Sequence, residues 1–329
     1  MKKISRILSL VILGIMVLAL AACGSKTSDS KASSAGSNDD KVVKIGYQKG
    51  NTINILKESG FLDKALKEEG YKVEWREFSH GGTLLEGLFT GNIDFGHAAD
   101  GSGINAQAGN KPFVYVGADK PNPEGIGLLV HKDSGIQDIQ ALKGKKIGVL
   151  KGGNHHYLAM LAIEDAGLKL DDVEWVYLQD ASQLRTAFET KKIDALGTYD
   201  PFFASAEIDL DTINLTEGKD YNYPNRTFYY ANEDFNKKHP ELVKIILDSI
   251  AKSDNWANKN KPEVVKLVAK SLGIDEKVIA RATERRTYGL DYMNDEITET
   301  QQKQADYYAK VGLIPQPVKV SERVVKIEE

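Results

Sequence analysis

The feature of this sequence that most constrains its fold is an internal repeat, in which one order of elements occurs twice about 100 residues apart. Each copy opens with a β-prone run and a glycine-containing loop, residues 42–51 in one copy and 145–154 in the other. A helical stretch closed by glycine follows, and then a second strand with the triplet Val-Glu-Trp at 73–75 or 173–175. Another helical stretch and an Ile-Asp segment complete each copy. Five elements in one order at one offset indicate two similarly folded halves.

Each half is predicted to be an α/β lobe, because strands that alternate with helices at this spacing form parallel sheets covered by helices. Ligands of open parallel sheets bind beyond the carboxyl ends of the strands. Two lobes that face each other therefore predict a ligand cleft between them. We expect the first part of lobe I at 41–124, lobe II at 125–230, and C-terminal helices that return to lobe I at 231–329.

Two crossings between the lobes are expected where turn signals interrupt the repeat. Residues 120–125 contain two prolines and a glycine and precede a β-prone run at 127–130. A second β-prone run, 227–231, follows the second copy. Beyond it, apolar residues at helical spacing predict four amphipathic helices. These helices are expected at about 240–258, 262–272, 275–285 and 296–311.

The first 22 residues have the organisation of a secretory signal peptide. Basic residues precede an uncharged run, 7–22, that is shorter than a typical membrane-spanning helix. The run ends in Leu20-Ala21-Ala22-Cys23, which resembles the bacterial lipobox, where the cysteine thiol receives a diacylglyceryl group and becomes the first residue. Cys23 is the only cysteine, so we expect lipidation there and no intramolecular disulfide. The alternative is an ordinary secretory signal followed by an unmodified cysteine.

The segment after the signal peptide, 23–40, is expected to be a lipidated tether. It is rich in Ser, Lys, Asp and Gly and has no large apolar residue, so we expect it to be disordered. Cleavage would remove three of the 43 basic residues and none of the 47 acidic ones, which changes the net charge from −4 to −7. This negative charge argues against a nucleic-acid partner.

Two glycine-containing loops are candidates for anion binding because each opens a predicted helix. They are Gly81-Gly82-Thr83 and Gly152-Gly153-Asn154. A helix start presents free backbone N–H groups and the positive end of the helix dipole, and glycine lets a ligand approach the backbone closely. Neither loop has a phosphate-binding-loop signature. Either loop alone is as readily a plain turn, but matching positions in facing lobes favour a site.

Several motifs resemble those of the aliphatic sulfonate-binding proteins and their nitrate- and taurine-binding relatives. They include Tyr47-Gln48-Lys49-Gly50, the run 82–96, Leu142-Lys143-Gly144-Lys145 and Asp200-Pro201. The resemblance covers about 44–203 and implies a type II periplasmic-binding-protein fold that closes on its ligand. It also implies a monomeric, lipid-anchored receptor outside the cell membrane. Such a receptor delivers an aliphatic sulfonate to the permease and ATPase of an ABC importer for sulfur uptake.

The resemblance implies ligand contacts from both lobes, and two departures from the family pattern leave the exact ligand open. Gly153-Asn154-His155 replaces a serine-rich run, and Tyr199 stands where relatives often have tryptophan. Tyr199 is added as a possible contact for an alkyl chain, and Arg226 as a planar cation suited to a sulfonate. The contacts implied by the resemblance are Gln48, Gly82, Thr83, Asp100, Gly152, Gly153, Asn154, His155, His156 and Asp200.

Some of these residues have alternative interpretations. Asp200 could pair with the ammonium of taurine or bond the backbone at the lobe junction, since aspartate before proline often forms a turn. Arg226 could be an ordinary solvated side chain. His155 and His156 would point about 100° apart on a helix, so they cannot easily bind one metal ion. We therefore expect no metal site and a neutral hydrogen-bonding role for one of the two histidines.

No enzymatic activity and no cofactor are expected. The sequence has no evident nucleophile–base pair, and lipidation would leave no free cysteine. Enzymes of the same superfamily that make the thiamine pyrimidine carry a cysteine-rich motif, which is absent here. The alternatives left open are taurine, nitrate or a thiamine-precursor pyrimidine as the ligand, a pyrimidine-synthesis enzyme, and a surface adhesin.

Overall fold

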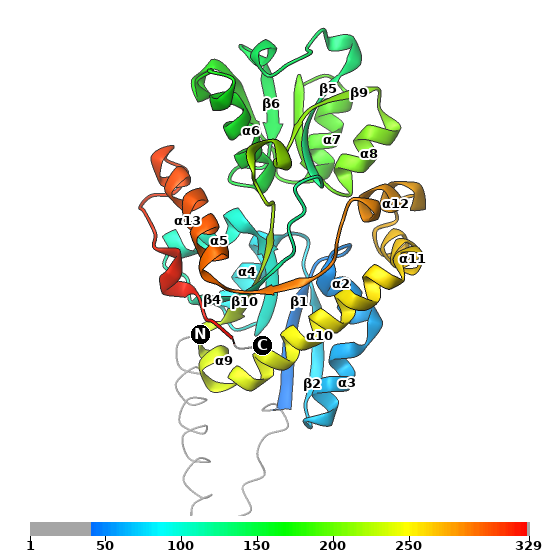
Figure 1. Ribbon diagram of the computed structural model, residues 1–329, viewed down its shortest axis with the longest axis vertical. Coiled ribbons are helices and arrows are strands. Elements are labelled where there is room, and N and C mark those ends of the chain that lie inside the picture. The colour runs from blue at the N-terminus through cyan, green and yellow to red at the C-terminus, as the bar shows by residue number, and fades with distance from the viewer. Residues whose placement is uncertain (1–40, 328–329) are drawn as a thin grey trace, which may run out of the picture. The chain divides into compact units, whose positions relative to one another are not determined.

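The computed structural model describes residues 41–327, and the chain divides into the units Met1–Asp40 and Lys41–Glu329. The predicted signal peptide, Cys23 and the tether lie outside the described residues. Within the second unit, two β-sheets lie one beyond the other and helices cover each of them (Figure 1). We call the first sheet and its helices lobe I, and the second sheet and its helices lobe II.

The sheet of lobe I has the strand order β11-β4-β10-β3-β1-β2, and that of lobe II has the order β7-β6-β8-β5-β9. Five successive strands of lobe I thus correspond to the five of lobe II, which confirms the internal repeat. The strands of lobe I are β1 (Val42–Tyr47), β2 (Lys72–Glu77), β3 (Phe95–Ala99), β4 (Phe113–Asp119), β10 (Thr227–Asn232) and β11 (Leu290–Tyr292). Those of lobe II are β5 (Ile126–His131), β6 (Lys146–Val149), β7 (Glu174–Tyr177), β8 (Ala195–Tyr199) and β9 (Thr212–Glu217).

The prediction of parallel sheets is right for the first three strands of each copy and wrong for the fourth. β1 pairs in parallel with β2 and β3, and β6 pairs in parallel with β7 and β8. β10 is antiparallel to β3, and β5 is antiparallel to β8. The reason is the crossing of the chain. The chain leaves one sheet at its carboxyl edge and enters the other sheet from that sheet's carboxyl edge. The first strand after each crossing therefore runs antiparallel to the strand beside it.

Helices cover both faces of each sheet, and the four predicted C-terminal helices are confirmed as α10 to α13 to within two residues. The helices of lobe I are α2 (Thr52–Ser59), α3 (Phe61–Glu68), α4 (Gly81–Phe89), α5 (Asp100–Ala108), α9 (Glu233–Lys238), α10 (Pro240–Lys259), α11 (Lys261–Leu272), α12 (Glu276–Glu284) and α13 (Asp295–Lys310). Those of lobe II are α6 (Asn154–Asp165), α7 (Ala181–Glu189) and α8 (Phe202–Asp209). Short 3-10 turns are η2 (Lys132–Ser134), η3 (Gln140–Leu142), η4 (Leu170–Asp172), η5 (Gly218–Tyr221) and η6 (Val320–Arg323).

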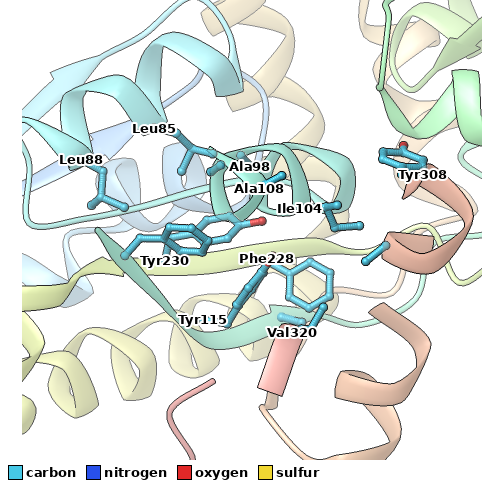
Figure 2. Close-up of a cluster of buried hydrophobic side chains, with 14 of the residues drawn as sticks. Leu85, Leu88, Ala98, Ile104, Ala108, Tyr115, Phe228, Tyr230, Tyr308 and Val320 are labelled. Carbon is cyan, nitrogen blue, oxygen red and sulfur yellow. The ribbon is translucent and has the colours of Figure 1, made fainter. Parts of the chain in front are cut away.

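Strand β10 shows how one sheet holds two apolar layers. Its successive side chains point to opposite faces, as the two-residue period of a strand requires. Phe228 and Tyr230 pack with Tyr115 of β4 and Ile104 of α5 on one face (Figure 2). Tyr229, between them, packs on the opposite face in the cluster that contains the apolar side of α10. Full burial of each such side chain stabilises the fold by about 1.5–3 kcal/mol.

Among the described residues, no helix combines the length and the apolar character that crossing a membrane would require.

Candidate functional site

The carboxyl edges of the two sheets meet at a pair of glycines. Gly101 lies in the first turn of α5, directly after β3, and Gly152 lies in the loop after β6. A Cβ atom at Gly101 would lie 2.3 Å from the carbonyl oxygen of Gly152, so only glycine permits this approach. Tyr308 of α13 donates a hydrogen bond to the same oxygen at 3.2 Å. The carboxyl ends of the strands, where the sequence predicts ligand binding, therefore face one another across the junction of the two lobes.

On the lobe I side, the start of α4 is open to solvent. Gly82 and Thr83 are exposed, and the Thr83 N–H donates only a long bond of 3.4 Å to Nδ1 of His80. Gln48 follows β1 and donates to the carbonyl oxygen of His97 at 3.2 Å. These three predicted contacts thus lie at the carboxyl edge of lobe I, and their contact with a ligand stays a prediction.

On the lobe II side, the glycine loop is closed by its own hydrogen bonds. The Gly152 N–H donates to Nδ1 of His156 at 3.1 Å, and the Gly153 N–H donates to the carbonyl oxygen of Leu150 at 3.0 Å. Asn154 Nδ2 donates to Asn225 Oδ1, near the second crossing, at 2.8 Å. In this conformation the glycine N–H groups already have partners, so their donation to an anion stays a prediction.

The two adjacent histidines of α6 have different roles. His155 uses both ring nitrogens internally, because Nε2 accepts from the Leu150 N–H at 2.9 Å and Nδ1 lies 3.0 Å from Asn154 Oδ1. His156 accepts at Nδ1, which places its proton on Nε2. Burial lowers the pKa of His155 to about 3 and that of His156 to about 4, so both rings are neutral at physiological pH. Of these two rings, only that of His156 keeps an N–H without a partner among the described residues.

Asp100 and Asp200 occupy equivalent places in the repeat, each directly after the third parallel strand. Asp100 is buried, and it accepts from the Gly101 N–H at 2.6 Å and from the hydroxyl of Tyr223. Asp200 accepts from the Ala204 N–H at 3.1 Å and from Nη2 of Arg285 at 3.2 Å. Burial raises the pKa of both carboxyls to about 6. Both carboxylates thus have protein partners, and contact of either with a ligand stays a prediction.

Arg226 is not a solvated side chain, which corrects one of the two interpretations of the sequence. Its side chain is 14% exposed, and Nη1 lies 2.6 Å from Asp291 Oδ2 and from the carbonyl oxygen of Asp119. The sequence does not predict this pairing because Asp291 is distant in the chain.

Tyr199 packs against the rings of His155 and Phe202, with ring centroids 5.4 and 5.7 Å away.

Asp100 and Arg226 line one cavity. This cavity has a volume of about 210 Å³ and lies beside the second crossing. Aromatic side chains line it from lobe II, with Tyr157, and from the crossing segment, with Tyr223. Gln304 of α13 adds a polar wall. Asp200 lies instead at a second cavity of about 30 Å³. The structure therefore distributes the predicted residues along the lobe junction.

Two consecutive arginines after α12 bind opposite lobes, and sequence inspection missed both. Arg285 is 5% exposed at its side chain and contacts lobe II, with Nη2 2.5 Å from Glu207 and its guanidinium 4.5 Å above the Phe203 ring. Arg286 contacts lobe I, with Nη2 2.6 Å from Asp119 Oδ2. Neighbouring charges at a helix end are typical of a solvated face, so the sequence offers no signal for this bridge.

Within residues 41–327, no three or more His, Cys, Asp or Glu side chains come together in a way that could hold a metal ion.

Comparison with known proteins places the chain among binding proteins. The family described as NMT1/THI5 like matches residues 57–264. A provisionally named aliphatic sulfonates-binding protein of Escherichia coli (strain K12) is 31% identical over 292 residues, which are 88% of this chain and 90% of that protein. The periplasmic aliphatic sulphonate binding protein SsuA from Escherichia coli superposes with a TM-score of 0.81 at 31% identity, covering 86% of this chain and 97% of that chain. The alkanesulfonate-binding protein SsuA from Xanthomonas axonopodis pv. citri, bound to MOPS, gives a TM-score of 0.81 at 26% identity, covering 87% and 99%.

One match is to an enzyme. A segment of 84 residues is 39% identical to a 4-amino-5-hydroxymethyl-2-methylpyrimidine phosphate synthase of Aspergillus parasiticus, and it covers 25% of this chain and 24% of the enzyme.

Proposed function

The chain belongs to the NMT1/THI5-like family, and on that premise we propose that it is the extracytoplasmic solute-binding receptor of an ABC importer. Its fold is the two-lobed α/β fold of the periplasmic binding proteins, as the sequence predicted. The ligand is a small organic anion, an aliphatic sulfonate, held between the lobes and delivered to a membrane permease with its ATPase. The receptor acts as a monomer. We place the first part of lobe I at 41–124 and lobe II from 125 onward, and because β10 (Thr227–Asn232) pairs in the lobe I sheet, the returning part begins at Thr227 and not at the expected residue 231.

The observation that carries this proposal is the extent of the similarity. The match to a structure of a sulphonate binding protein at 31% identity takes in 86% of this chain, which is more than either lobe contains. A ligand held between two lobes requires both lobes to be retained in the same arrangement. The meeting of the carboxyl edges at Gly101 and Gly152 supports a ligand position there.

Calorimetry on the Lys41–Glu329 unit tests the proposal. Ethanesulfonate, taurine, nitrate and sulfate are titrated separately, and the expected result is one saturable site for ethanesulfonate with weaker or no binding of the inorganic anions. Tighter binding of taurine or nitrate than of ethanesulfonate would mean that the chain resembles the taurine- or nitrate-binding relatives in its ligand. Absence of binding to all four would contradict the proposed ligand class.

A catalytic role in pyrimidine synthesis is the second candidate, and the 84-residue match to a synthase favours it. The single cysteine of the chain is Cys23, which precedes the folded unit, so a cysteine-rich catalytic motif has no counterpart here. We propose that the chain binds its ligand without chemical change. Recovery of unaltered ethanesulfonate after prolonged incubation, checked by mass spectrometry, is the expected result.

We also propose that the receptor is held at the outer face of the cell membrane through a lipid on Cys23. A single acyl chain gives marginal retention, whereas a diacylglyceryl group supplies the two chains that stable anchoring needs. Replacing Cys23 with alanine in the full-length chain is therefore expected to release the protein from the membrane fraction. Fractionation and mass spectrometry of the N-terminus check this. Equal retention of the variant would show that the lipid is not the anchor.

A further inference from the structure

Three side chains gather at the carboxyl edge of lobe II. Lys151 follows β6, Tyr177 ends β7, and His156 lies in the first turn of α6. The ammonium of Lys151 lies 5.6 Å from the centroid of the Tyr177 ring, and the His156 ring meets the same ring edge-on at 5.4 Å. Tyr177 is 42% exposed and is one of two large apolar side chains that are exposed in the described part of the chain. The cluster therefore places a partly exposed aromatic ring beside an ammonium group and a histidine ring.

Lys151 and His156 offer donors in this cluster and have no carboxylate beside them among the described residues. Within residues 41–327, no carboxylate lies within ion-pair distance of Lys151, and no acceptor takes the Nε2–H of the neutral His156 ring. By contrast, Arg226, Arg285 and Arg286 are paired with carboxylates. Two unpaired donors, the Lys151 ammonium and the His156 Nε2–H, beside an exposed ring match an anion that carries a carbon chain.

The internal repeat supplies a comparison within the same chain. Tyr47 of β1 pairs with Glu77 of β2, and Val149 of β6 pairs with Tyr177 of β7. The lysine two residues after the first strand is therefore Lys49 in lobe I and Lys151 in lobe II. Lys49 is neutralised by Glu77, with Nζ 3.2 Å from Oε1. In lobe II a tyrosine replaces that carboxylate, which leaves the Lys151 charge available and puts an aromatic ring beside it.

We propose that Lys151, His156 and Tyr177 form the lobe II half of the ligand site. The Lys151 ammonium and the His156 Nε2–H donate to the oxygens of the anionic head group, and the Tyr177 ring packs against the carbon chain. This assignment rests on the proposed function and makes it more specific. It selects a singly charged organic oxyanion with an alkyl chain over an inorganic anion, which has nothing to place on the ring.

Calorimetry with ethanesulfonate and butanesulfonate on the Lys41–Glu329 unit tests the assignment. Lys151→Met is expected to weaken both ligands about 10- to 100-fold, the range for loss of a hydrogen bond to a charged group. Tyr177→Ala is expected to weaken butanesulfonate by a larger factor than ethanesulfonate, because the longer chain covers more of the ring. Lys145→Met is the matched control, since Lys145 precedes β6 at its opposite, amino end. This variant removes the same charge and is expected to bind normally.

The outcomes separate this inference from the function on which it rests. Binding by the unsubstituted protein, together with unchanged affinities for Lys151→Met and Tyr177→Ala, would overturn the assignment and leave the receptor function intact. Failure of the unsubstituted protein to bind either sulfonate would overturn the proposed ligand class and this assignment together. An equal loss for Lys145→Met and Lys151→Met would show a general effect of charge and would also overturn the assignment. Unfolding midpoints confirm that each variant is folded.

Discussion

Replacing Arg285 with alanine is expected to lower the free energy of unfolding by about 3–5 kcal/mol, the range for removal of one partner from a buried ion pair. The Arg285 side chain is 5% exposed and contacts Asp200 and Glu207 of lobe II. Its removal leaves the Asp200 carboxylate buried with one backbone N–H as its remaining described donor. Urea unfolding of the Lys41–Glu329 unit at neutral pH measures the change.

Arg281 provides the matched control because it lies one turn earlier on α12. Its side chain is 46% exposed, and its ion pairs are longer, at 3.9 Å to Glu207 and 3.4 Å to Glu284. Arg281→Ala is therefore expected to cost less than about 1 kcal/mol. Equal losses for the two variants would show that the Arg285 contacts do not stabilise the lobe junction.

Between about pH 6.5 and 7.5, the carboxyl group of Asp254 is expected to contribute a fall of up to about 1.4 kcal/mol per pH unit to the free energy of unfolding. Burial raises the pKa of Asp254 to about 8, and the nearby carboxylate of Asp119 adds to this effect. Arg286, Tyr229 and Thr52 donate to Asp119, whereas Asp254 Oδ2 has no donor among the described residues. Asp254 is therefore the member of the pair that keeps its proton.

The direction of the pH effect follows from the sign of the shift. The folded pKa of Asp254 lies above its ordinary value of 3.8, so the native state binds one more proton than the unfolded chain between the two values. This contribution to stability is complete at acid pH and is lost as the pH rises toward about 8. Burial also raises the pKa of Asp100 and Asp200 to about 6, so their contributions are mostly lost below the chosen window. The buried rings of His97, His155 and His156, whose pKa values burial lowers to about 3, 3 and 4, act in the opposite sense, because the unfolded chain takes up protons on them below about pH 7.

Asp254→Asn removes this titrating group, so the slope of stability against pH in this window is expected to be more positive in the variant than in the unsubstituted protein, while the histidines contribute equally to both. Urea unfolding at pH 6.5, 7.0 and 7.5 measures it, where about 1.4 kcal/mol per unit corresponds to one proton. Asp248→Asn on the same helix is the control, because that side chain is 44% exposed and paired with Lys244. An unchanged slope in Asp254→Asn would mean that another group holds the proton.

The sequence predicted those parts of the fold that local signals specify. Strand and glycine-closed helix signals repeated at one offset were sufficient to predict two α/β lobes and the helices α10 to α13. The antiparallel direction of β5 and β10 could not be predicted in the same way, because a strand has the same local pattern in either direction. Its direction depends on which edge the crossing chain enters.

The sequence predicted where along the backbone the candidate site lies, but it did not predict which side chains pair with one another there. Gly101 and Gly152 lie at strand ends that the repeat marks, yet only the three-dimensional structure shows that they touch. The pairing of Arg285 with Asp200 joins residues 85 positions apart, and no local pattern encodes it. Tyr177 could have been found from sequence by comparing the two copies, since it stands where the first copy has Glu77.

Small-angle scattering with ethanesulfonate tests most directly whether the ligand is held between the lobes. Contacts from both lobes are satisfied together only when the lobes approach each other, so the ligand should shift the population toward a closed form. The account predicts a smaller radius of gyration for the Lys41–Glu329 unit at saturating ethanesulfonate than without it. Sulfate at the same ionic strength serves as the control and should leave the radius unchanged. An unchanged radius at a ligand concentration that calorimetry shows to be saturating would contradict binding between the lobes.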